Sequence, residues 1–242
     1  MLCRWSSFSK KGGRRYNEDN CIAERMEDSY LWVVADGMGG HHGGEVASQL
    51  AVESMLRHFE RDPSVSKEML EAHLLFANER IMELQNENAQ FQNMQTTIVA
   101  ALTNGCKTII GHLGDSRCYL FRNGRIDFRT MDHSVVQMMV KQGEITEKDM
   151  RTHEDRNKVL KSLGKGGELK PSYLVVDTPL QTGDALLLCT DGFWEYVMDG
   201  EMEVDYYKSQ FPEEWLGKME KRLLGRAKKN HDNYTAMAVF VL

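Results

Sequence analysis

The chain has 242 residues, of which 41% are hydrophobic and 27% are charged, and its formal net charge is -6. This length is sufficient for one large domain with a sizeable core. The net negative charge argues against a general nucleic-acid binder, because proteins of that class usually display a basic surface.

The cysteines and the lack of long apolar segments indicate the compartment. The cysteines are odd in number, widely spaced and without a Cys-x-x-Cys pair, which is typical of reduced thiols rather than of a disulfide or zinc framework. No segment approaches the ~20 apolar residues of a membrane span, and the N-terminus lacks the apolar core of a signal peptide. We therefore expect a single domain over residues 1–242 that is cytoplasmic and has no membrane partner. The cysteines are Cys3, Cys21, Cys106, Cys118 and Cys189.

The first predicted elements are a strand, a glycine-rich turn and two helices. Residues 29–36 form an apolar run that ends in Asp-Gly, and residues 45–59 follow with apolar residues at helical spacing. A second helix is predicted to begin near Ser66, which is a favourable N-cap residue. One apolar stripe on this second helix indicates a face that is buried in the core. Its members are Leu70, Leu74, Ala77, Ile81 and Leu84.

From Thr96 onward, short runs rich in β-branched and aromatic residues predict strands. The dipeptide Asn123-Gly124 predicts a type I′ hairpin, because both turn positions need a positive φ. Residues 134–164 are predicted to be helical and polar, with a capping box at Thr146 and Asp149. Helices together with mostly antiparallel strands predict an α+β fold in which helices cover the sheet faces. The predicted strands are residues 96–103, 107–114, 116–121, 125–131, 172–178, 185–191 and 234–242.

Aspartates recur at one kind of position, the end or the start of a predicted strand. A glycine after the aspartate lets the chain turn and exposes its carbonyl oxygen as another ligand. If the strands converge, several carboxylates would repel one another strongly unless a cation neutralised them. An all-oxygen site indicates magnesium or manganese, whereas zinc would usually recruit His or Cys. Any one of these residues alone is more simply a turn or cap residue. The four are Asp36, Asp115, Asp191 and Asp232.

Residues 14–20 place an arginine close to two acidic residues. The planar guanidinium of Arg14 is suited to bind phosphate, and Glu18 and Asp19 follow it. Taken alone, the segment is better explained as a surface loop with salt bridges.

Taken in order, these motifs resemble the bacterial metal-dependent serine/threonine phosphatases of type 2C, the PPM family. The resemblance covers the chain from about residue 6 to the C-terminus. It implies a four-layer α-β-β-α sandwich, in which two central antiparallel sheets are flanked by helices and the metals lie at one end. It also implies that residues 134–167 form a variable flap beside the site, which influences substrate choice. The motifs are Arg14-x-x-Asn17-Glu18-Asp19, residues 34–48, Thr96-Thr97, residues 111–117, Asp132-His133-Ser134, residues 188–192 and Asp232-Asn233-x-Thr235.

The resemblance implies a centre of two Mn2+ or Mg2+ ions. Asp36 would bridge the two ions. Asp191 and Asp232 would bind one of them, and the carbonyl of Gly37 would bind the other. In the implied mechanism a hydroxide that bridges the ions attacks the phosphorus in line, and no covalent enzyme intermediate is required.

The remaining residues of the motifs receive supporting roles from the resemblance. Glu18 and Asp19 would act largely through metal-bound waters. Asp115 would help to hold a third, weaker metal ion. Arg14 would bind the phosphate of the substrate.

The chain departs from the family pattern at two positions. Some members have a histidine two residues after the bridging aspartate, where it has been assigned as the general acid, and this chain has Met38 there. The general acid is therefore unassigned. Gln95 replaces a glycine that often precedes the paired threonines, and this change is expected to affect packing only. Four other histidines were weighed as general acids, and none has strong support. They are His41, His42, His133 and His153.

Other classes of function fit less well. The spacing of Gly37, Gly39 and Gly43 is G-x-G-x-x-x-G, which is not the dinucleotide fingerprint. None of the cysteines begins the Cys-x5-Arg loop of a cysteine-based phosphatase, and no Walker motif is present. The main alternative is a catalytically weak or dead relative that binds phosphoproteins as an adaptor, and the retained ligands argue against it.

The expected partners follow from the expected reaction. They are phosphoprotein substrates and a cognate Ser/Thr kinase whose signalling the enzyme opposes, and the protein is expected to be a monomer. Residues 218–229 form a basic run that could dock a partner, although a solvated helix face is the simpler interpretation.

Overall fold

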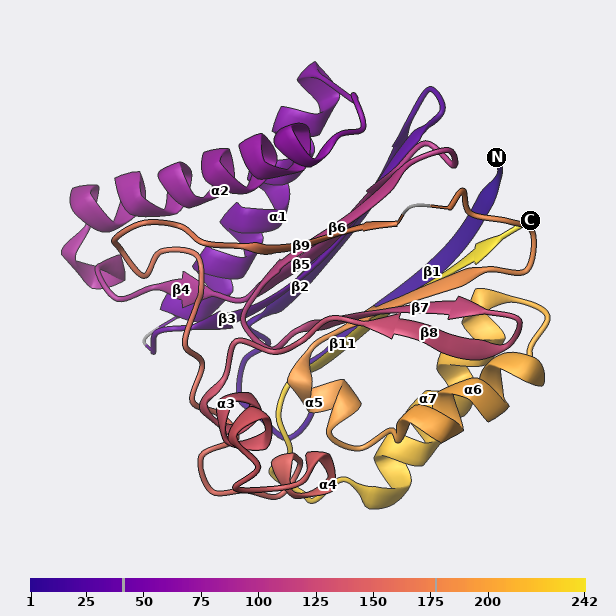
Figure 1. Cartoon of the computed structure of the whole chain (residues 1–242). Helices are drawn as coiled ribbons and strands as arrows, with labels where there is room; N and C mark the ends of the chain where they lie inside the picture. The colour runs from indigo at the N-terminus through magenta and orange to yellow at the C-terminus, as the bar shows by residue number, and fades with distance from the viewer. Residues whose placement is uncertain (41, 177) are drawn as a thin grey trace.

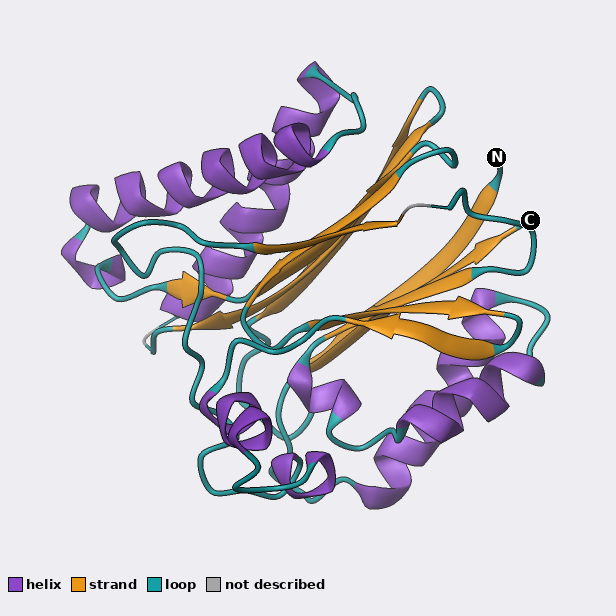
Figure 2. Ribbon diagram, in the orientation of Figure 1, coloured by secondary structure: helices purple, strands orange, loops and turns teal. Residues whose placement is uncertain are grey.

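Two antiparallel β-sheets pack face to face at the centre of the molecule, and helices cover the outer face of each sheet (Figure 1). The computed structural model describes residues 1–40, 42–176 and 178–242. Figure 2 shows the resulting order of layers, helix, sheet, sheet and helix. The α+β fold and the α-β-β-α sandwich are thereby confirmed.

The first sheet contains the two ends of the chain. Its strands, in spatial order, are β1 (Cys3–Lys10), β11 (Tyr234–Val241), β10 (Ala185–Cys189), β7 (Arg117–Arg122) and β8 (Arg125–Arg129). Its outer face is covered by α5 (Asp191–Trp194), α6 (Asp199–Tyr207) and α7 (Pro212–Arg226).

The second sheet is formed mainly by the first half of the chain. Its strands, in spatial order, are β2 (Asp19–Met26), β3 (Ser29–Met38), β5 (Ile98–Thr103), β6 (Thr108–Leu113) and β9 (Ser172–Val176), with β4 (Gln95–Thr96) paired to the end of β3. Its outer face is covered by α1 (Gly43–Arg61) and α2 (Lys67–Glu87), and a short 3-10 turn, η1 (Ala89–Phe91), follows α2. The short helices α3 (Val135–Gln142) and α4 (Glu147–Met150) lie at one end of the sandwich (Figure 1).

The core consists of three apolar layers, one between the sheets and one between each sheet and the helices that cover it. The central strands have buried side chains on both faces, which explains why they read as continuous apolar runs. Large aromatic residues fill the layer between the sheets, where Tyr30 stacks on Trp32 with ring centroids 5.4 Å apart. This layer holds the two sheets together.

Local sequence signals placed several boundaries correctly. The Ser66 side chain accepts a hydrogen bond from the Met69 backbone N–H at 3.0 Å and caps α2. Asn123 and Gly124 both have positive φ, 51° and 74°, as a type I′ hairpin requires. The Asp149 carboxylate accepts a hydrogen bond from the Thr146 backbone N–H at 2.8 Å, which is one half of the predicted capping box.

The prediction of a helical segment over residues 134–164 is wrong for most of its length. Only α3 and α4 are helical, and residues 151–171 form turns and loops. Gly143 ends α3 with a φ of 77°, in the left-handed region that stops a helix. The strand predicted over residues 185–191 is also too long, because β10 ends at Cys189 and Asp191 begins α5. The predicted strand 172–178 ends at Val176, and Asp177 lies outside the described residues.

Two strands were not predicted at all. β1 and β2 each lie at the edge of a sheet, and their sequences mix polar and apolar residues. A partly solvated edge strand does not need a continuous apolar run, so hydrophobicity alone gave little signal there.

Candidate metal centre

The predicted acidic residues come together at one end of the sandwich. The antiparallel register of β2 and β3 places Asp19 directly opposite Asp36. Asp115 lies in the turn between β6 and β7, and Asp191 is the first residue of α5. Asp232 lies two residues before β11. These residues are far apart in the sequence. They come together because they flank strands of both sheets at the same end of the sandwich.

Hydrogen bonds from two threonines fix the backbone of Asp36. The Thr97 N–H and the Thr96 hydroxyl donate to the Asp36 carbonyl at 2.8 and 2.9 Å. The Asp36 N–H donates to Thr97 Oγ1 at 3.2 Å. Thr97 Oγ1 also lies 2.7 Å from the Ser116 hydroxyl, which follows Asp115. The paired threonines thus connect the strand of Asp36 to the turn of Asp115.

The glycines after the two aspartates do not turn the chain, contrary to the prediction. Gly37 continues β3 and pairs with Thr96, and Gly192 lies within α5. A Cβ atom on Gly37 would lie 1.9 Å from the carbonyl oxygen of Gly44, and one on Gly192 would lie 1.9 Å from that of Asn233. Glycine is needed at both positions because another backbone segment packs directly against it.

Removal from water raises the pKa of four carboxyl groups at this end of the sandwich. Burial, followed by the charge of Asp19, raises the pKa of Asp36 well above its usual value. Burial and the charge of Asp191 have the same effect on the pKa of Asp115. The pKa of Asp19 rises to about 8 through burial, and that of Asp191 rises to about 6 through burial and the charge of Asp232. A cation would remove this repulsion.

The donor set fits a hard divalent cation. All the candidate side-chain ligands are carboxylates, and Asp19 Oδ1 is buried without a hydrogen-bond partner although Thr190 donates to its other oxygen at 2.9 Å. Among residues 1–40, 42–176 and 178–242, no three Asp, Glu, His or Cys side chains already converge as ligands.

Arg14 lies beside this group of acids. Its Nη2 donates to Asp232 Oδ2 at 2.6 Å, and both side chains are partly exposed. Asn233 holds the loop that carries Arg14 because its side-chain amide donates to the carbonyls of Lys11 and Tyr16, each at 2.8 Å. The Glu18 N–H donates to Asn233 Oδ1 at 2.9 Å. This anchoring role of Asn233 could not be predicted from its place in the motif Asp232-Asn233-x-Thr235.

A cavity of about 760 Å³ opens next to Asp191 and Asp232. Its walls come from α4 and the following turns, from α5, and from the segment between α7 and β11. Glu195, which the sequence analysis missed, lies in this cavity and pairs with Arg156 at 3.1 Å. Burial and the charge of Asp191 raise the pKa of Glu195 to about 8. No local sequence signal marked Glu195, because its partner is 39 positions away in the chain.

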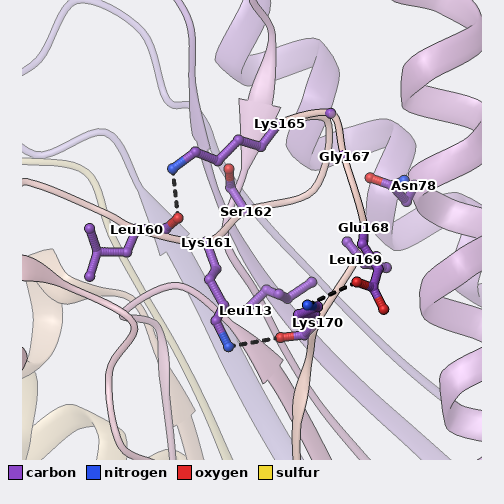
Figure 3. Close-up of a pocket in the computed structure, with 11 residues that line it drawn as sticks. Asn78, Leu113, Leu160, Lys161, Ser162, Lys165, Gly167, Glu168, Leu169 and Lys170 are labelled. Atoms are coloured by element: carbon purple, nitrogen blue, oxygen red, sulfur yellow. Dashed lines mark hydrogen bonds and ion pairs between the residues drawn. The ribbon is translucent and has the colours of Figure 1, made fainter.

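A second cavity, of about 290 Å³, is lined mainly by residues between Leu160 and Lys170, together with Asn78 and Leu113 (Figure 3). Its lysines are engaged in holding their own loop. Lys165 donates to the carbonyl of Leu160 at 2.6 Å, and Lys161 donates to that of Lys170 at 3.0 Å. These two lysines stabilise the loop that forms the cavity, and they have little freedom to bind another group.

The histidines that were considered as general acids occupy different surroundings. His42 contacts Glu45 at 3.2 Å and lies against the ring of Tyr16. His133 Nε2 lies 2.8 Å from the Ser172 hydroxyl, and burial lowers its pKa to about 3, so His133 is neutral near pH 7. His153 accepts a hydrogen bond from the Asp155 N–H at 3.1 Å. His41 lies outside the described residues.

Met38 and Gln95, the two departures from the family pattern, pair with each other where β3 meets β4. The Ser162 hydroxyl donates to the Gln95 side chain at 2.8 Å, and the residues after α4 are thereby fastened to the sheet. Gln95 thus affects packing, as expected. Met38 supplies no proton donor.

Comparisons with known proteins agree with the fold. The family profile of protein phosphatase 2C matches residues 11–229. The chain belongs to the protein phosphatase 2C family. It is accordingly a serine/threonine protein phosphatase of the PPM type, and enzymes of this family depend on metal ions.

Individual relatives of this phosphatase are similar over most of their length. The chain is 36% identical over 208 residues to the serine/threonine phosphatase stp of Listeria welshimeri, and the match covers 81% of this chain and 79% of that protein. The crystal structure of Stp1 from Staphylococcus aureus is 30% identical, with a TM-score of 0.90, and the match covers 100% of this chain and 96% of Stp1. The catalytic domain of PstP, solved in complex with two manganese ions, is 30% identical with a TM-score of 0.83 over 99% of this chain and 98% of that domain.

In the part of the phosphatase that the structure describes, every helix is too short or too polar to cross a membrane.

Proposed function

We propose that this phosphatase hydrolyses phosphoserine and phosphothreonine in proteins at a centre of two Mn2+ or Mg2+ ions. Asp36 would bridge the ions, and the remaining direct ligands would be Asp191, Asp232 and the Gly37 carbonyl. The observation that carries the proposal is the shared rise in the pKa values of the buried carboxyl groups, since only a cation would stabilise their ionised forms together. The two manganese ions bound to the related PstP domain support the number of ions and one of the two metals.

Two further acidic residues would complete the surroundings of the ions. Glu18 and Asp19 would hold metal-bound waters. The buried Asp19 oxygen that lacks a hydrogen-bond partner is suited to accept a hydrogen bond from such a water. Asp115 would help to bind a third, weaker ion, because its carboxylate is buried and lies close enough to Asp191 to be affected by its charge.

The bound ions would supply an activated water and neutralise the charge on the phosphoryl oxygens. The contribution of the protein is to position the phosphate. Arg14 has five N–H donors, and the bond to Asp232 uses one of them, so the others remain to bind phosphoryl oxygens. Asn233 keeps Arg14 in place by anchoring the 11–18 loop.

The biological setting is proposed at a coarser level. Phosphoproteins are the substrates, and a cognate Ser/Thr kinase would be opposed by the enzyme, which would act as a monomer. All five cysteines are free, which supports the cytoplasm or another reducing compartment. Residues 134–167 would act as a flap that influences substrate choice within a single domain, because several residues of this segment line the cavity beside Asp191.

The test is hydrolysis of p-nitrophenyl phosphate and of a phosphothreonine peptide with manganese, with magnesium and with EDTA. Activity should require the metal and should be lost in Asp36→Asn. Asp127→Asn is the matched control, because Asp127 is a half-exposed aspartate on β8, and it should retain full activity. If the folded wild-type protein with manganese hydrolyses neither substrate, the adaptor alternative replaces this proposal.

A further inference from the structure

The cavity beside Asp191 and Asp232 is rich in cationic side chains. Its lining contains six basic residues and three acidic ones, and two of the acidic residues are proposed metal ligands. The basic residues are Arg14, Lys148, Arg151, Arg156, Arg226 and Lys228. The chain as a whole has a net charge of -6, so this concentration of positive charge is local to one cavity.

The arginines of the cavity already have carboxylate partners. Arg151 pairs with Asp199 at 3.0 Å, and Arg226 pairs with Glu201. Arg156 pairs with Glu195, as described above. These contacts hold the three arginine side chains against the walls of the cavity.

The two lysines differ from the arginines in this respect. Lys148 comes from α4, and Lys228 comes from the segment after α7, so the two lie in different walls of the same cavity. Both are exposed, and within the described part of the chain neither has a carboxylate within ion-pairing distance. Two lysines of the second cavity, Lys161 and Lys165, are not available in the same way (Figure 3). Both donate hydrogen bonds to carbonyls of their own loop.

The cavity is also in the right place and of the right size to hold part of a substrate. It shares Arg14, Asp191 and Asp232 with the candidate metal centre, so a peptide with its phosphate at that centre must pass its neighbouring residues over the cavity. Its volume of about 760 Å³ is within the range of about 300–1,000 Å³ that is usual for ligand pockets.

We propose that Lys148 and Lys228 bind anionic side chains next to the phosphoserine or phosphothreonine, so that the enzyme prefers acidic phosphoprotein segments. This proposal depends on the proposed function and adds the substrate class to it. The anionic groups are either Asp and Glu carboxylates or a second phosphate, since both would pair with exposed ammonium groups.

The test compares the kcat/KM values for four phosphothreonine peptides of one length. Their flanking residues are glutamine, glutamate, lysine, or glutamine with a second phosphothreonine. The wild type should prefer the glutamate peptide to the glutamine peptide by about fivefold for each exposed ion pair that forms. The lysine peptide should be the poorest substrate. The preference should appear in KM and should weaken at high salt, because it arises from screened charges in the bound ground state.

The double variant Lys148→Gln/Lys228→Gln should lose the preference for acidic flanks and keep wild-type activity on the glutamine peptide and on p-nitrophenyl phosphate. Lys221→Gln is the matched control, because Lys221 is an exposed lysine on α7 outside the cavity, and it should keep the preference. The inhibition constants of non-hydrolysable phosphonate peptides should change in the same way. The doubly phosphorylated peptide shows which source of negative charge binds more tightly.

Two outcomes would overturn the proposal. One is a wild-type enzyme that hydrolyses the glutamine and glutamate peptides equally well. The other is a double variant that keeps the full preference. An absence of metal-dependent hydrolysis on every substrate would instead overturn the proposed function, so the two failures are distinguishable.

Discussion

Asp19 and Asp36 are directly opposed residues of the β2–β3 ladder, and the charge of Asp19 helps to raise the pKa of Asp36. Two acidic residues in such a position destabilise a folded protein unless they are protonated or bind a cation. The pairing of Asp19 with Asp36 therefore destabilises the metal-free protein at the site where the family binds its metals.

This destabilisation predicts how the stability of the metal-free protein depends on pH. Folding raises the pKa of Asp19 to about 8, so the folded state binds more protons than the unfolded state up to that pH. The free energy of unfolding, measured with urea in a chelator, should fall from about pH 6.5 to about pH 8, by about 1 kcal/mol per pH unit for each such carboxyl group. Burial lowers the pKa values of His73 and His133 to about 4 and about 3, so only the unfolded chain protonates them near pH 6.5. The rise in stability that they add is nearly complete by about pH 7, and the decrease caused by Asp19 dominates above it.

The variant Asp19→Asn isolates the effect. It should flatten the decrease in stability over the same window, and manganese should stabilise the wild type more at the upper end of the window than at the lower end. A wild-type stability that stays constant or increases from about pH 6.5 to about pH 8 would contradict the predicted linkage.

The glycine after Asp36 gives a second prediction. Gly37→Ala should lower the free energy of unfolding by about 2 kcal/mol or more and abolish activity, because the new Cβ would collide with the Gly44 carbonyl. Gly217→Ala in α7 is the matched control, since a Cβ there meets no atom within 4 Å. That substitution should increase stability by about 0.5–1 kcal/mol. Chemical denaturation and the hydrolysis of p-nitrophenyl phosphate measure both effects, and equal behaviour of the two variants would refute the explanation.

Much of the fold could be predicted from the sequence because its signals are local. Ser66 caps a helix within one turn, and Asn123-Gly124 forms its hairpin by its own backbone preference. The position of Asp19 could not be predicted from periodicity, because β2 is an edge strand without a continuous apolar run. The carboxylates at strand ends were recognisable as a group. Their close approach depends on how the two sheets are stacked.

The parts of the site that depend on tertiary packing were not predictable from local patterns. Glu195 acquires its raised pKa from Asp191 and from burial, and its partner Arg156 belongs to a distant segment. The role of Gly37 was misjudged for the same reason. An Asp-Gly pair suggests a turn, whereas the actual constraint is the backbone of Gly44 against the strand.

A buried ion pair behind the site gives a third prediction. Arg117 binds Asp132 through two hydrogen bonds, of 2.8 and 2.7 Å, and lies 3.4 Å from the ring centroid of Trp194. The Trp194 indole donates in turn to the Asp115 carbonyl at 2.9 Å. Asp132→Ala should therefore destabilise the protein by about 3–5 kcal/mol, because it leaves a buried guanidinium without its carboxylate partner.

The control for this pair is an exposed arginine. Arg125 pairs with Glu203 at 2.9 Å, and its side chain is 80% exposed. Arg125→Ala should cost at most about 1 kcal/mol. Urea unfolding of both variants decides the matter, and a cost for Asp132→Ala as small as that for Arg125→Ala would show that the pair contributes little.

The last prediction concerns the phosphate-binding residue. Arg14→Ala should lower kcat/KM by about 100-fold, since one preorganised cationic donor at a transferring phosphoryl group contributes about that much. The stability of this variant should change little, because Arg14 is half-exposed and its ion pair with Asp232 is partly solvated. Arg15→Ala is the control, since Arg15 lies over the ring of Tyr16 on the same loop. Arg15→Ala should keep most of the activity. If Arg14→Ala retained wild-type kcat/KM, the phosphate would have to be held by other groups, of which Arg151 and Arg156 line the same cavity.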